Sequence, residues 1–286
     1  MKPSWNQPCT AKLDRVRVVG GFRWPAQLPT VRHFTTVTDS FVRGQTTVRT
    51  YLRCRRLIHP ERGTQVYWQY WPQHCWLKPW RITIVADDVR GLWMGDLEPF
   101  VRLCDLYSIP LLELAIDFQA CTGIDKTFVR RHGVFGKSRP RLDRGGGDQL
   151  RYGTRQSDKL VRAYAKPSVG AFRIELETHS RILRRAAISD VKDAPALARF
   201  LIPTHFEFAE LEWPNLRRHL LLKFGRLGSE LFAATETHAH SLHRALGFLR
   251  RAGVRNVHRF LRIRPETNLA KAAIERWAAE FKDGAL

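Results

Sequence analysis

Residues 111–118 have the sequence Leu-Leu-Glu-Leu-Ala-Ile-Asp-Phe, and this stretch decides the fold class. Because side chains alternate between the two faces of a strand, its even-numbered residues form a continuous apolar face. Glu113, Ala115 and Asp117 then point the other way. The pattern predicts a core strand with a carboxylate near its end.

The same alternation, or a run of β-branched and aromatic residues, predicts further strands on both sides of this stretch. The predicted strands are residues 12–19, 65–71, 81–85, 149–153, 159–166 and 172–177. Residues 167–170, Pro-Ser-Val-Gly, predict a tight turn between the last two. Residues 30–60 have weak periodicity and support no prediction.

Helical spacing marks a second set of segments. The predicted helices are residues 97–107, 126–135, 182–188, 194–201, 231–251 and 269–281, and the glycine- and arginine-rich residues 137–147 predict a basic loop. The expected fold is α+β, an antiparallel-rich β-sheet with helices packed on one face and a helical C-terminal region. Composition changes near residue 200, which predicts a sheet-rich domain over 1–200 and a helical region over 201–286.

The chain is strongly basic. Its 286 residues include 48 Lys and Arg against 27 Asp and Glu, a net charge of +21. Such a charge speeds the capture of polyanions and favours DNA or RNA as a partner over an anionic membrane or a merely solvated basic surface. No apolar run approaches the roughly 20 residues that span a bilayer, and the N-terminus lacks a secretory signal. We therefore expect no membrane partner and a cytoplasmic location.

The five cysteines are an odd number, widely spaced and without a Cys-x-x-Cys pair. This spacing argues against a disulfide framework and against a zinc finger. We expect free, mostly buried thiols.

Reactive side chains gather on the hairpin predicted for residues 159–177. The turn sets a register in which Tyr164 faces Arg173 and Arg162 faces Glu175, and directly opposed residues share a face. Lys166 lies on that face too. Glu177 belongs to the same alternating set as Glu175, and Asp117 joins them if its strand lies beside the hairpin.

This set of side chains suits phosphodiester transesterification. Carboxylates on a rigid sheet bind a hard divalent cation that orients the scissile bond. A tyrosine hydroxyl becomes a nucleophile when its phenolate is stabilised, and Lys and Arg stabilise the charge that develops in the transition state. Ordinary structural roles remain open: a strand-end aspartate often accepts hydrogen bonds, Arg and Glu on a strand often form ion pairs, and a strand tyrosine often packs.

Three stretches occur in order: Leu-Ala-Ile-Asp at 114–117, a run from Leu150 to Lys166 that holds Gly-Thr-Arg, Ser and Arg-Ala-Tyr-Ala-Lys, and Phe-Arg-Ile-Glu-Leu-Glu at 172–177. They resemble the metal-binding aspartate strand, the Gly-Ser-Arg, Ser, Arg-x-Tyr-x-Lys run and the Arg-x-Glu strand of the Rep-trans family. That family includes initiators of rolling-circle plasmids and filamentous phages and relaxases of conjugative elements. The resemblance covers about a quarter of the chain. Thr154 replaces the usual serine, and Ala165 stands where aspartate or asparagine is common.

The resemblance implies a replication-initiator-like catalytic domain over residues 1–200 that nicks and rejoins one origin strand through a 5′-phosphotyrosine intermediate. It implies DNA, single-stranded or cruciform, as the partner, with a host helicase and a second copy of the chain as further candidates. Tyr164 would be the nucleophile, with Lys166 and Arg162 in catalytic contact with the phosphate. The other implied residues are Asp117, Glu175 and Glu177 as ligands of Mg²⁺ or Mn²⁺, and Arg155, Arg173, Arg151 and Lys159 as DNA contacts. The alternative is a non-catalytic basic DNA- or RNA-binding regulator.

Other motifs suggest different sites. His238-Ala239-His240 matches the paired histidines of another nickase superfamily, but a helix over 231–251 would point them apart. Glu236, His240 and His243 would share a face of that helix and could bind zinc, although surface histidines are the plainer interpretation. Residues 242–254 could form a helix-turn-helix or simply pack. The aromatic residues of 67–80 could stack unpaired bases or fill a core.

Overall fold

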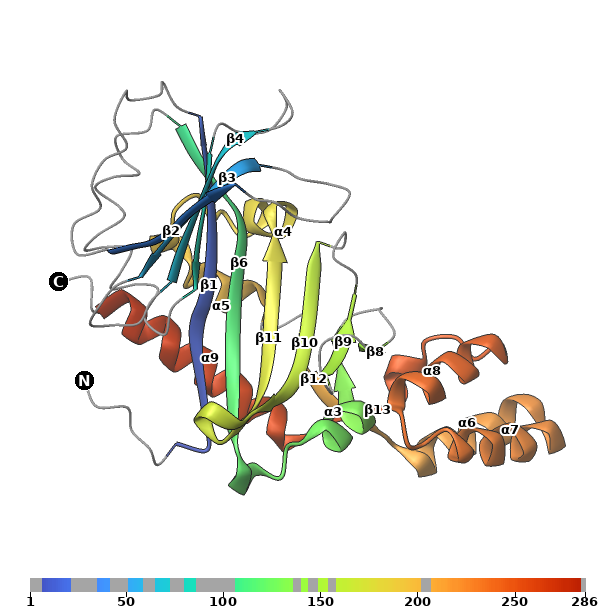
Figure 1. Ribbon diagram of the computed structural model, residues 1–286. Helices are drawn as coiled ribbons and strands as arrows, with labels where there is room; N and C mark the ends of the chain where they lie inside the picture. The colour runs from blue at the N-terminus through green and yellow to red at the C-terminus, as the bar shows by residue number, and fades with distance from the viewer. Residues whose placement is uncertain are drawn as a thin grey trace. The chain divides into compact units, whose positions relative to one another are not determined.

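The computed structural model describes residues 7–21, 35–41, 51–58, 65–72, 80–85, 106–135, 140–143, 149–153, 158–201 and 207–283. Strands make up the N-terminal part of these ranges, and helices dominate the C-terminal part (Figure 1). The α+β fold expected from the sequence is confirmed.

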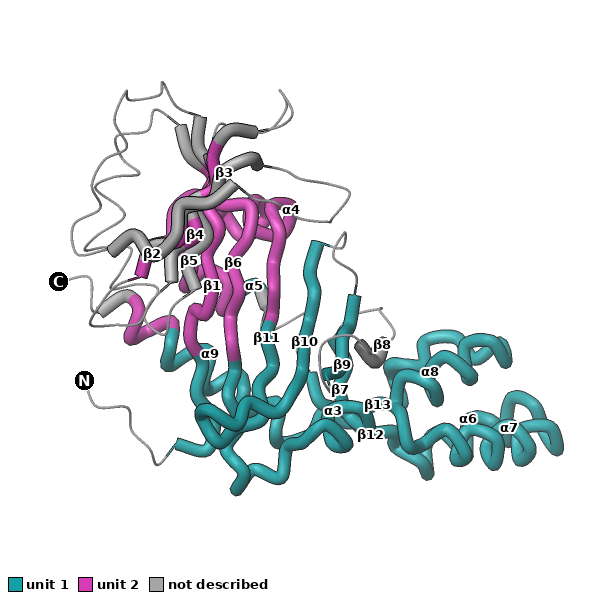
Figure 2. Tube along the Cα trace, in the orientation of Figure 1, with its two compact units in different colours: residues 1–11, 116–175, 199–277 teal, residues 12–115, 176–198, 278–286 magenta. Residues whose placement is uncertain are grey.

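The chain divides into two units (Figure 2). Unit 1 comprises residues 1–11, 116–175 and 199–277, and unit 2 comprises residues 12–115, 176–198 and 278–286. Strands β6 (Leu106–Gln119) and β11 (Ala171–His179) each contribute residues to both units. Unit 1 takes residues from both sides of residue 200, and the domain boundary expected there stays a prediction.

Unit 2 holds the N-terminal strands. They are β1 (Cys9–Gly21), β2 (Thr35–Phe41), β3 (Tyr51–Ile58), β4 (Gln65–Pro72) and β5 (Trp80–Val85), in the sheet order β2-β3-β4-β5-β1-β6. The β1–β5 pairing is antiparallel and sets Val16 opposite Ile84 and Val18 opposite Ile82. The strands predicted at 12–19, 65–71 and 81–85 are confirmed. β2 and β3 lie where the sequence supported no prediction, because arginines interrupt the alternation of β3.

Unit 1 contains a sheet in the order β6-β11-β10-β9-β8. Its remaining strands are β10 (Lys159–Lys166), β9 (Gln149–Tyr152) and β8 (Pro140–Asp143), and the β10–β9 and β8–β9 pairs are antiparallel. A single 3₁₀ turn (η3, Pro167–Val169) joins β10 to β11, and Gly170 closes it with a φ of 61°, a conformation that favours glycine. The predicted strands and turn are confirmed.

Two predictions near this sheet are wrong in part. β8 occupies residues 140–143 of the expected basic loop, with Pro140 at its first position, where a missing N–H is tolerated. The helix predicted for 97–107 is wrong at its end, because strand β6 begins at Leu106. Residues 97–105 lie outside the described ranges.

Helix α3 (Lys126–His132) begins at Asp125, whose side chain accepts from the Phe128 backbone N–H at 2.6 Å. It ends three residues before the predicted end at 135, because Gly133 and Val134 form strand β7 and pair with β12 (Glu207–Leu211). β12 also pairs with β13 (Leu261–Ile263), which gives unit 1 a second sheet in the order β13-β12-β7.

The C-terminal helices are α6 (Trp213–Phe224), α7 (Arg226–Thr237), α8 (Leu242–Arg251) and α9 (Pro265–Asp283), with a 3₁₀ turn, η5 (Val257–Phe260), after α8. Buried leucines of α6 and α8, including Leu216, Leu220, Leu246 and Leu249, share a core with β12. The single helix predicted for 231–251 is wrong. Residues 238–240 form a turn. At this turn the side chains of Thr237 and His240 form hydrogen bonds with backbone carbonyls a few residues earlier in the chain.

Shorter elements complete unit 2: α4 (Ser180–Arg185), η4 (Val191–Asp193) and the start of α5 (Ala196–Leu201). These match the helices predicted at 182–188 and 194–201, and α9 matches the one predicted at 269–281. Within the described ranges, the search for membrane-spanning helices finds none of sufficient length and apolarity.

Candidate active site

Asp117 and Arg173 form a buried ion pair in unit 1. The Arg173 Nε and Nη2 atoms each lie 2.6 Å from one carboxylate oxygen of Asp117. Arg173 has 0% exposed surface and the Asp117 side chain 10%. Such a bidentate, charge-assisted pair fixes both side chains. Both oxygens of Asp117 therefore accept hydrogen bonds from a guanidinium. The family resemblance makes this same residue a metal ligand.

Tyr164 lies two strand positions from Arg162, and both contact the same carboxylate. The Tyr164 hydroxyl donates a hydrogen bond to Glu175 Oε1, while Arg162 Nη2 lies 2.9 Å from Glu175 Oε2. Glu175 is buried, whereas Tyr164 and Arg162 are half-buried. The sequence predicted that Arg162 faces Glu175, and the ion pair brings them together. The carboxylate is in position to accept the phenolic proton.

The face that carries these groups is more enclosed than the sequence suggested. Alternation on β11 predicted an open polar face with Arg173, Glu175 and Glu177, but residues 171–178 are all buried. β11 lies between β6 and β10, and its Arg173 and Glu175 side chains pair with Asp117 of β6 and Arg162 of β10. Buried charges of this kind require partners, which explains why each one is paired.

Arginines align across the neighbouring strands. Arg162 of β10 lies opposite Arg151 of β9, and Arg151 lies opposite Arg141 of β8 in register. Like charges at opposed positions need anions nearby, and Glu175 supplies one to Arg162 at 2.9 Å. This arginine row, defined as Arg141, Arg151 and Arg162, ends at the strand that carries Tyr164.

The predicted DNA contact Lys159 and the predicted catalytic residue Lys166 both lie on β10. Lys159 begins the strand, and burial lowers the pKa of its amine from 10.5 to about 8. Lys166 ends the strand and is half-buried. Arg155 lies outside the described residues.

Tyr152 provides an internal comparison for Tyr164. Its hydroxyl donates to the Val129 carbonyl at 3.2 Å, its ring packs edge-on against Phe135, and burial raises the pKa of the phenol. A phenol enclosed in this way is unsuited to attack a phosphate.

Acidic groups gather in unit 2 as well. Arg15 donates to Glu113 and, at 2.9 Å, to Glu177, whose other oxygen lies 2.9 Å from His179 Nε2. Asp14 and Glu113 belong to a group of carboxylates whose ligand oxygens lie within 4.8 Å of one another. Such a group could hold a metal ion, and oxygen ligands suit a hard divalent cation.

Sequence reasoning missed several of these residues. Strand alternation had already set Glu113 on the face of Asp117, which was a usable signal. Asp14 and Arg15 lie about 100 residues before Glu113, and Arg141 lies in a segment expected to be a loop. No local pattern could have joined them to the site.

The competing motifs find no support as sites. The zinc interpretation of Glu236, His240 and His243 required a continuous helix, and the turn at 238–240 removes their common face. α8 is followed by a turn and η5 rather than by a second α-helix, and its leucines are buried, which matches the packing interpretation. In the aromatic segment Tyr70 is buried, and residues 73–79 lie outside the described ranges.

The side chains of Cys9 and Cys121 are described, and both thiols are free. Cys9 is buried, which raises the pKa of its thiol to about 12, and Cys121 is exposed.

Comparisons with known proteins find a likeness at the level of structure alone. No family model matches the chain, and no curated protein matches it. Among solved structures, a rolling circle replication initiator protein from Geobacillus stearothermophilus aligns with 70% of this chain and 86% of its own, at 15% identity and a TM-score of 0.37. Similarity at that TM-score is too weak to assign a function.

Proposed function

We propose that this protein is a DNA-nicking replication initiator that cleaves and rejoins one strand through Tyr164. The observation that supports it most directly is the hydrogen bond from the Tyr164 hydroxyl to Glu175. This phenol is half-buried and bound to a carboxylate that can take its proton, whereas Tyr152 is enclosed in the core.

The proposed reaction is a transesterification. The Tyr164 oxygen attacks the scissile phosphorus as its proton passes to Glu175. A Tyr–O–P bond forms, and the 3′-oxygen of the neighbouring nucleotide leaves. Since one phosphodiester bond replaces another, the reverse attack by a 3′-hydroxyl restores the strand. Arg162 and Lys166 stabilise the charge on the phosphate oxygens.

The arginine row supports a path for the bound strand. Arg151 and Arg162 lie at opposed positions of neighbouring strands. Phosphates that bind along them would release counterions, which adds to the binding free energy. Arg151 and Lys159 would hold phosphates near the nucleophile. Arg173 was also predicted to contact DNA, and its complete burial against Asp117 favours a positioning role instead.

A divalent ion, Mg²⁺ or Mn²⁺, would polarise the scissile phosphate and raise the reactivity of phosphorus. In unit 2, Asp14 and Glu113 offer oxygens of the required type. In unit 1, Arg173 holds Asp117, and Tyr164 and Arg162 hold Glu175, so metal binding by either predicted carboxylate stays a prediction. A helicase and a second copy of the chain stay predictions.

The decisive experiment detects the covalent intermediate. A pool of single-stranded oligonucleotides labelled at the 3′ end is incubated with the full chain and Mn²⁺, then separated under denaturing conditions. We expect label on the wild-type protein and on Tyr152→Phe, and none on Tyr164→Phe. An adduct of equal yield with Tyr164→Phe would exclude Tyr164 as the nucleophile. Binding without any adduct in the wild type would favour the non-catalytic DNA- or RNA-binding regulator.

A further inference from the structure

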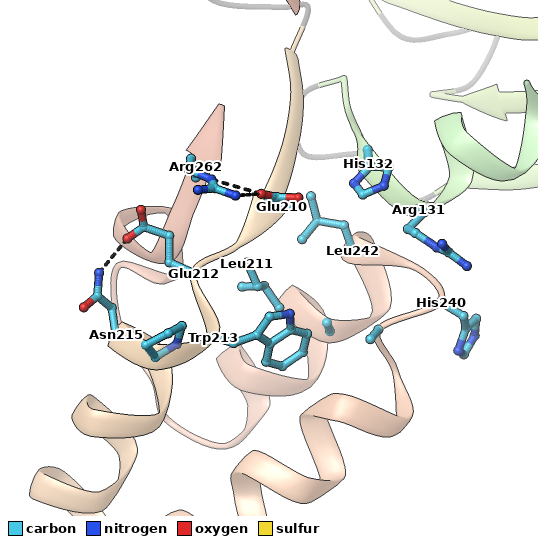
Figure 3. A pocket seen from close by; sticks show the side chains of 13 residues that line it. Arg131, His132, Glu210, Leu211, Glu212, Trp213, Asn215, His240, Leu242 and Arg262 are labelled. Carbon is cyan, nitrogen blue, oxygen red and sulfur yellow. Dashed lines mark hydrogen bonds and ion pairs between the residues drawn. The ribbon is translucent and has the colours of Figure 1, made fainter. Parts of the chain in front are cut away.

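A cavity of about 720 Å³ opens in unit 1, apart from the hairpin that carries Tyr164 (Figure 3). Its walls come from the end of α3, from β12 and the start of α6, from the turn at 238–240 with α8, and from β13. Its size falls within the range of small-molecule sites.

The floor of the cavity is apolar. Trp213 lies there with Leu211 and Leu242 (Figure 3). The Trp213 ring packs edge-on against Phe232, with centroids 5.7 Å apart, and stays half-buried. A fixed and partly accessible indole is a platform on which a flat ring can stack.

One side of the cavity presents hydrogen-bonding groups that lie in fixed positions. Asn215 Nδ2 donates to Glu212 Oε2 at 2.7 Å, which orients the carboxylate and the amide together. The other lining carboxylate, Glu210, is bound by Arg262 and by Arg264. Glu212 is therefore the carboxylate placed to accept from an amino group of a ligand.

The opposite side presents a guanidinium and an imidazole. Arg131 and His240 lie across the cavity from Glu212 and Asn215, and both are exposed (Figure 3). The cavity thus has an acceptor-rich end, an aromatic floor and a basic end. A nucleotide has the same succession of groups: a polar base edge, a flat base and a phosphate.

We propose that this cavity binds one nucleoside monophosphate unit, with the base stacked on Trp213, its amino edge at Glu212 and Asn215, and its phosphate at Arg131 and His240. Carboxylates accept from the exocyclic amino group of cytosine, so a cytosine-type edge is preferred to thymine. The inference deepens the proposed function, since an extruded base of the bound strand is the expected occupant. A free nucleotide offers the same chemistry.

The test uses the full chain with two probes, deoxycytidine monophosphate and a short labelled oligodeoxycytidine, against oligothymidine. Trp213→Ala should weaken oligodeoxycytidine binding about 5- to 140-fold, the loss expected for one stacked base. Glu212→Gln should remove the preference over oligothymidine. Leu222→Ala, at an exposed position of α6 outside the cavity lining, is the control and should bind as the wild type does.

A blocking variant keeps the proposal testable if Trp213→Ala misfolds. Ala239→Trp places a large ring at a half-buried lining position and should weaken oligodeoxycytidine binding to a similar extent. Competition by the mononucleotide would assign the site to free nucleotides as well, and binding of the oligonucleotide alone would assign it to the strand. Unchanged affinity in both Ala239→Trp and Glu212→Gln overturns the proposal.

The cavity and the nicking reaction can fail separately. Tyr164→Phe should bind oligodeoxycytidine with wild-type affinity while losing the covalent adduct. Wild-type affinity in the cavity variants would contradict only the proposed nucleotide site. An intact adduct in Tyr164→Phe would contradict only the role of Tyr164 as the nucleophile.

Discussion

Arg173 has no exposed surface, and its partner explains how a buried guanidinium is tolerated. Both Asp117 oxygens accept from it at 2.6 Å, so the charge is neutralised where water cannot reach. Glu175 accepts from Tyr164 on one oxygen and pairs with Arg162 on the other. The Asp117–Arg173 pair thus holds two side chains of the sheet in place, and the contacts of Glu175 orient Tyr164, the candidate nucleophile.

Removing one member of the buried pair should therefore be costly. Arg173→Met leaves the Asp117 carboxylate buried without its partner, and we expect a loss of about 3–5 kcal/mol in the free energy of unfolding. Urea denaturation measures it. Arg262→Met is the matched control: Arg262 and its partner Glu210 are 68% and 26% exposed, and water can replace the contact. Equal losses in the two variants would contradict the role of burial.

Lys159 should make DNA binding depend on pH. Burial lowers the pKa of its amine to about 8, so the amine is charged at pH 7 and mostly neutral at pH 9. Only the charged form attracts phosphate, and affinity should fall as pH rises through 8. Lys159→Arg stays charged across this range. Fluorescence anisotropy should show a flatter profile for the variant, and identical profiles would rule out Lys159 as a phosphate contact.

Among elements, α6 and α7 form a hairpin at Gly225, which has a φ of 56°. The two helices are in close contact at Gly228, where an added Cβ would lie 2.2 Å from the Leu220 carbonyl oxygen. Only glycine fits this crossing without moving backbone. The geometry of this helical hairpin therefore depends on two single glycines, Gly225 and Gly228, rather than on helix propensity.

A pair of glycine substitutions tests this contact. Gly228→Ala should destabilise the fold by about 1–3 kcal/mol, because the backbone of α6 must move. Gly247→Ala, within α8, meets only an Arg251 side-chain nitrogen at 3.7 Å and should gain about 0.5–1 kcal/mol from helix propensity. Thermal melting followed by circular dichroism measures both. A stable Gly228→Ala variant would mean that the helices separate readily.

For the whole molecule, the dominant property is the net charge of +21. It gives a general attraction for polyanions, which the arginine row would focus on one sheet. Affinity for DNA should consequently decrease steeply as salt is raised.

The salt dependence can locate individual phosphate contacts. Each contact that is removed should lower the slope of log affinity against log salt by about 1. We expect this for Arg151→Ala, while Arg185→Ala, at an exposed position of α4 in unit 2, should leave the slope unchanged. Equal slopes in wild type and Arg151→Ala would mean that the arginine row is not part of the DNA-binding surface.

The sequence by itself determined the strands with clear alternation, the turn at 167–170, the α+β class and the basic charge. Each of these depends on neighbours along the chain, and so local pattern sufficed. It did not determine β2, β3 or β8, whose irregular sequences are stabilised by pairing, nor the break of the 231–251 helix, where Thr237 and His240 bond to nearby carbonyls.

For the candidate site, the sequence supplied residue types and the approach of Arg162 to Glu175. Only the tertiary structure showed that Arg173 holds both oxygens of Asp117, that Asp14 and Arg15 approach Glu113, and that Trp213 floors a cavity. The physical reason is the distance along the chain over which each effect acts. Alternation and propensity act over a few residues, whereas buried charges select partners that only folding brings within a few ångströms.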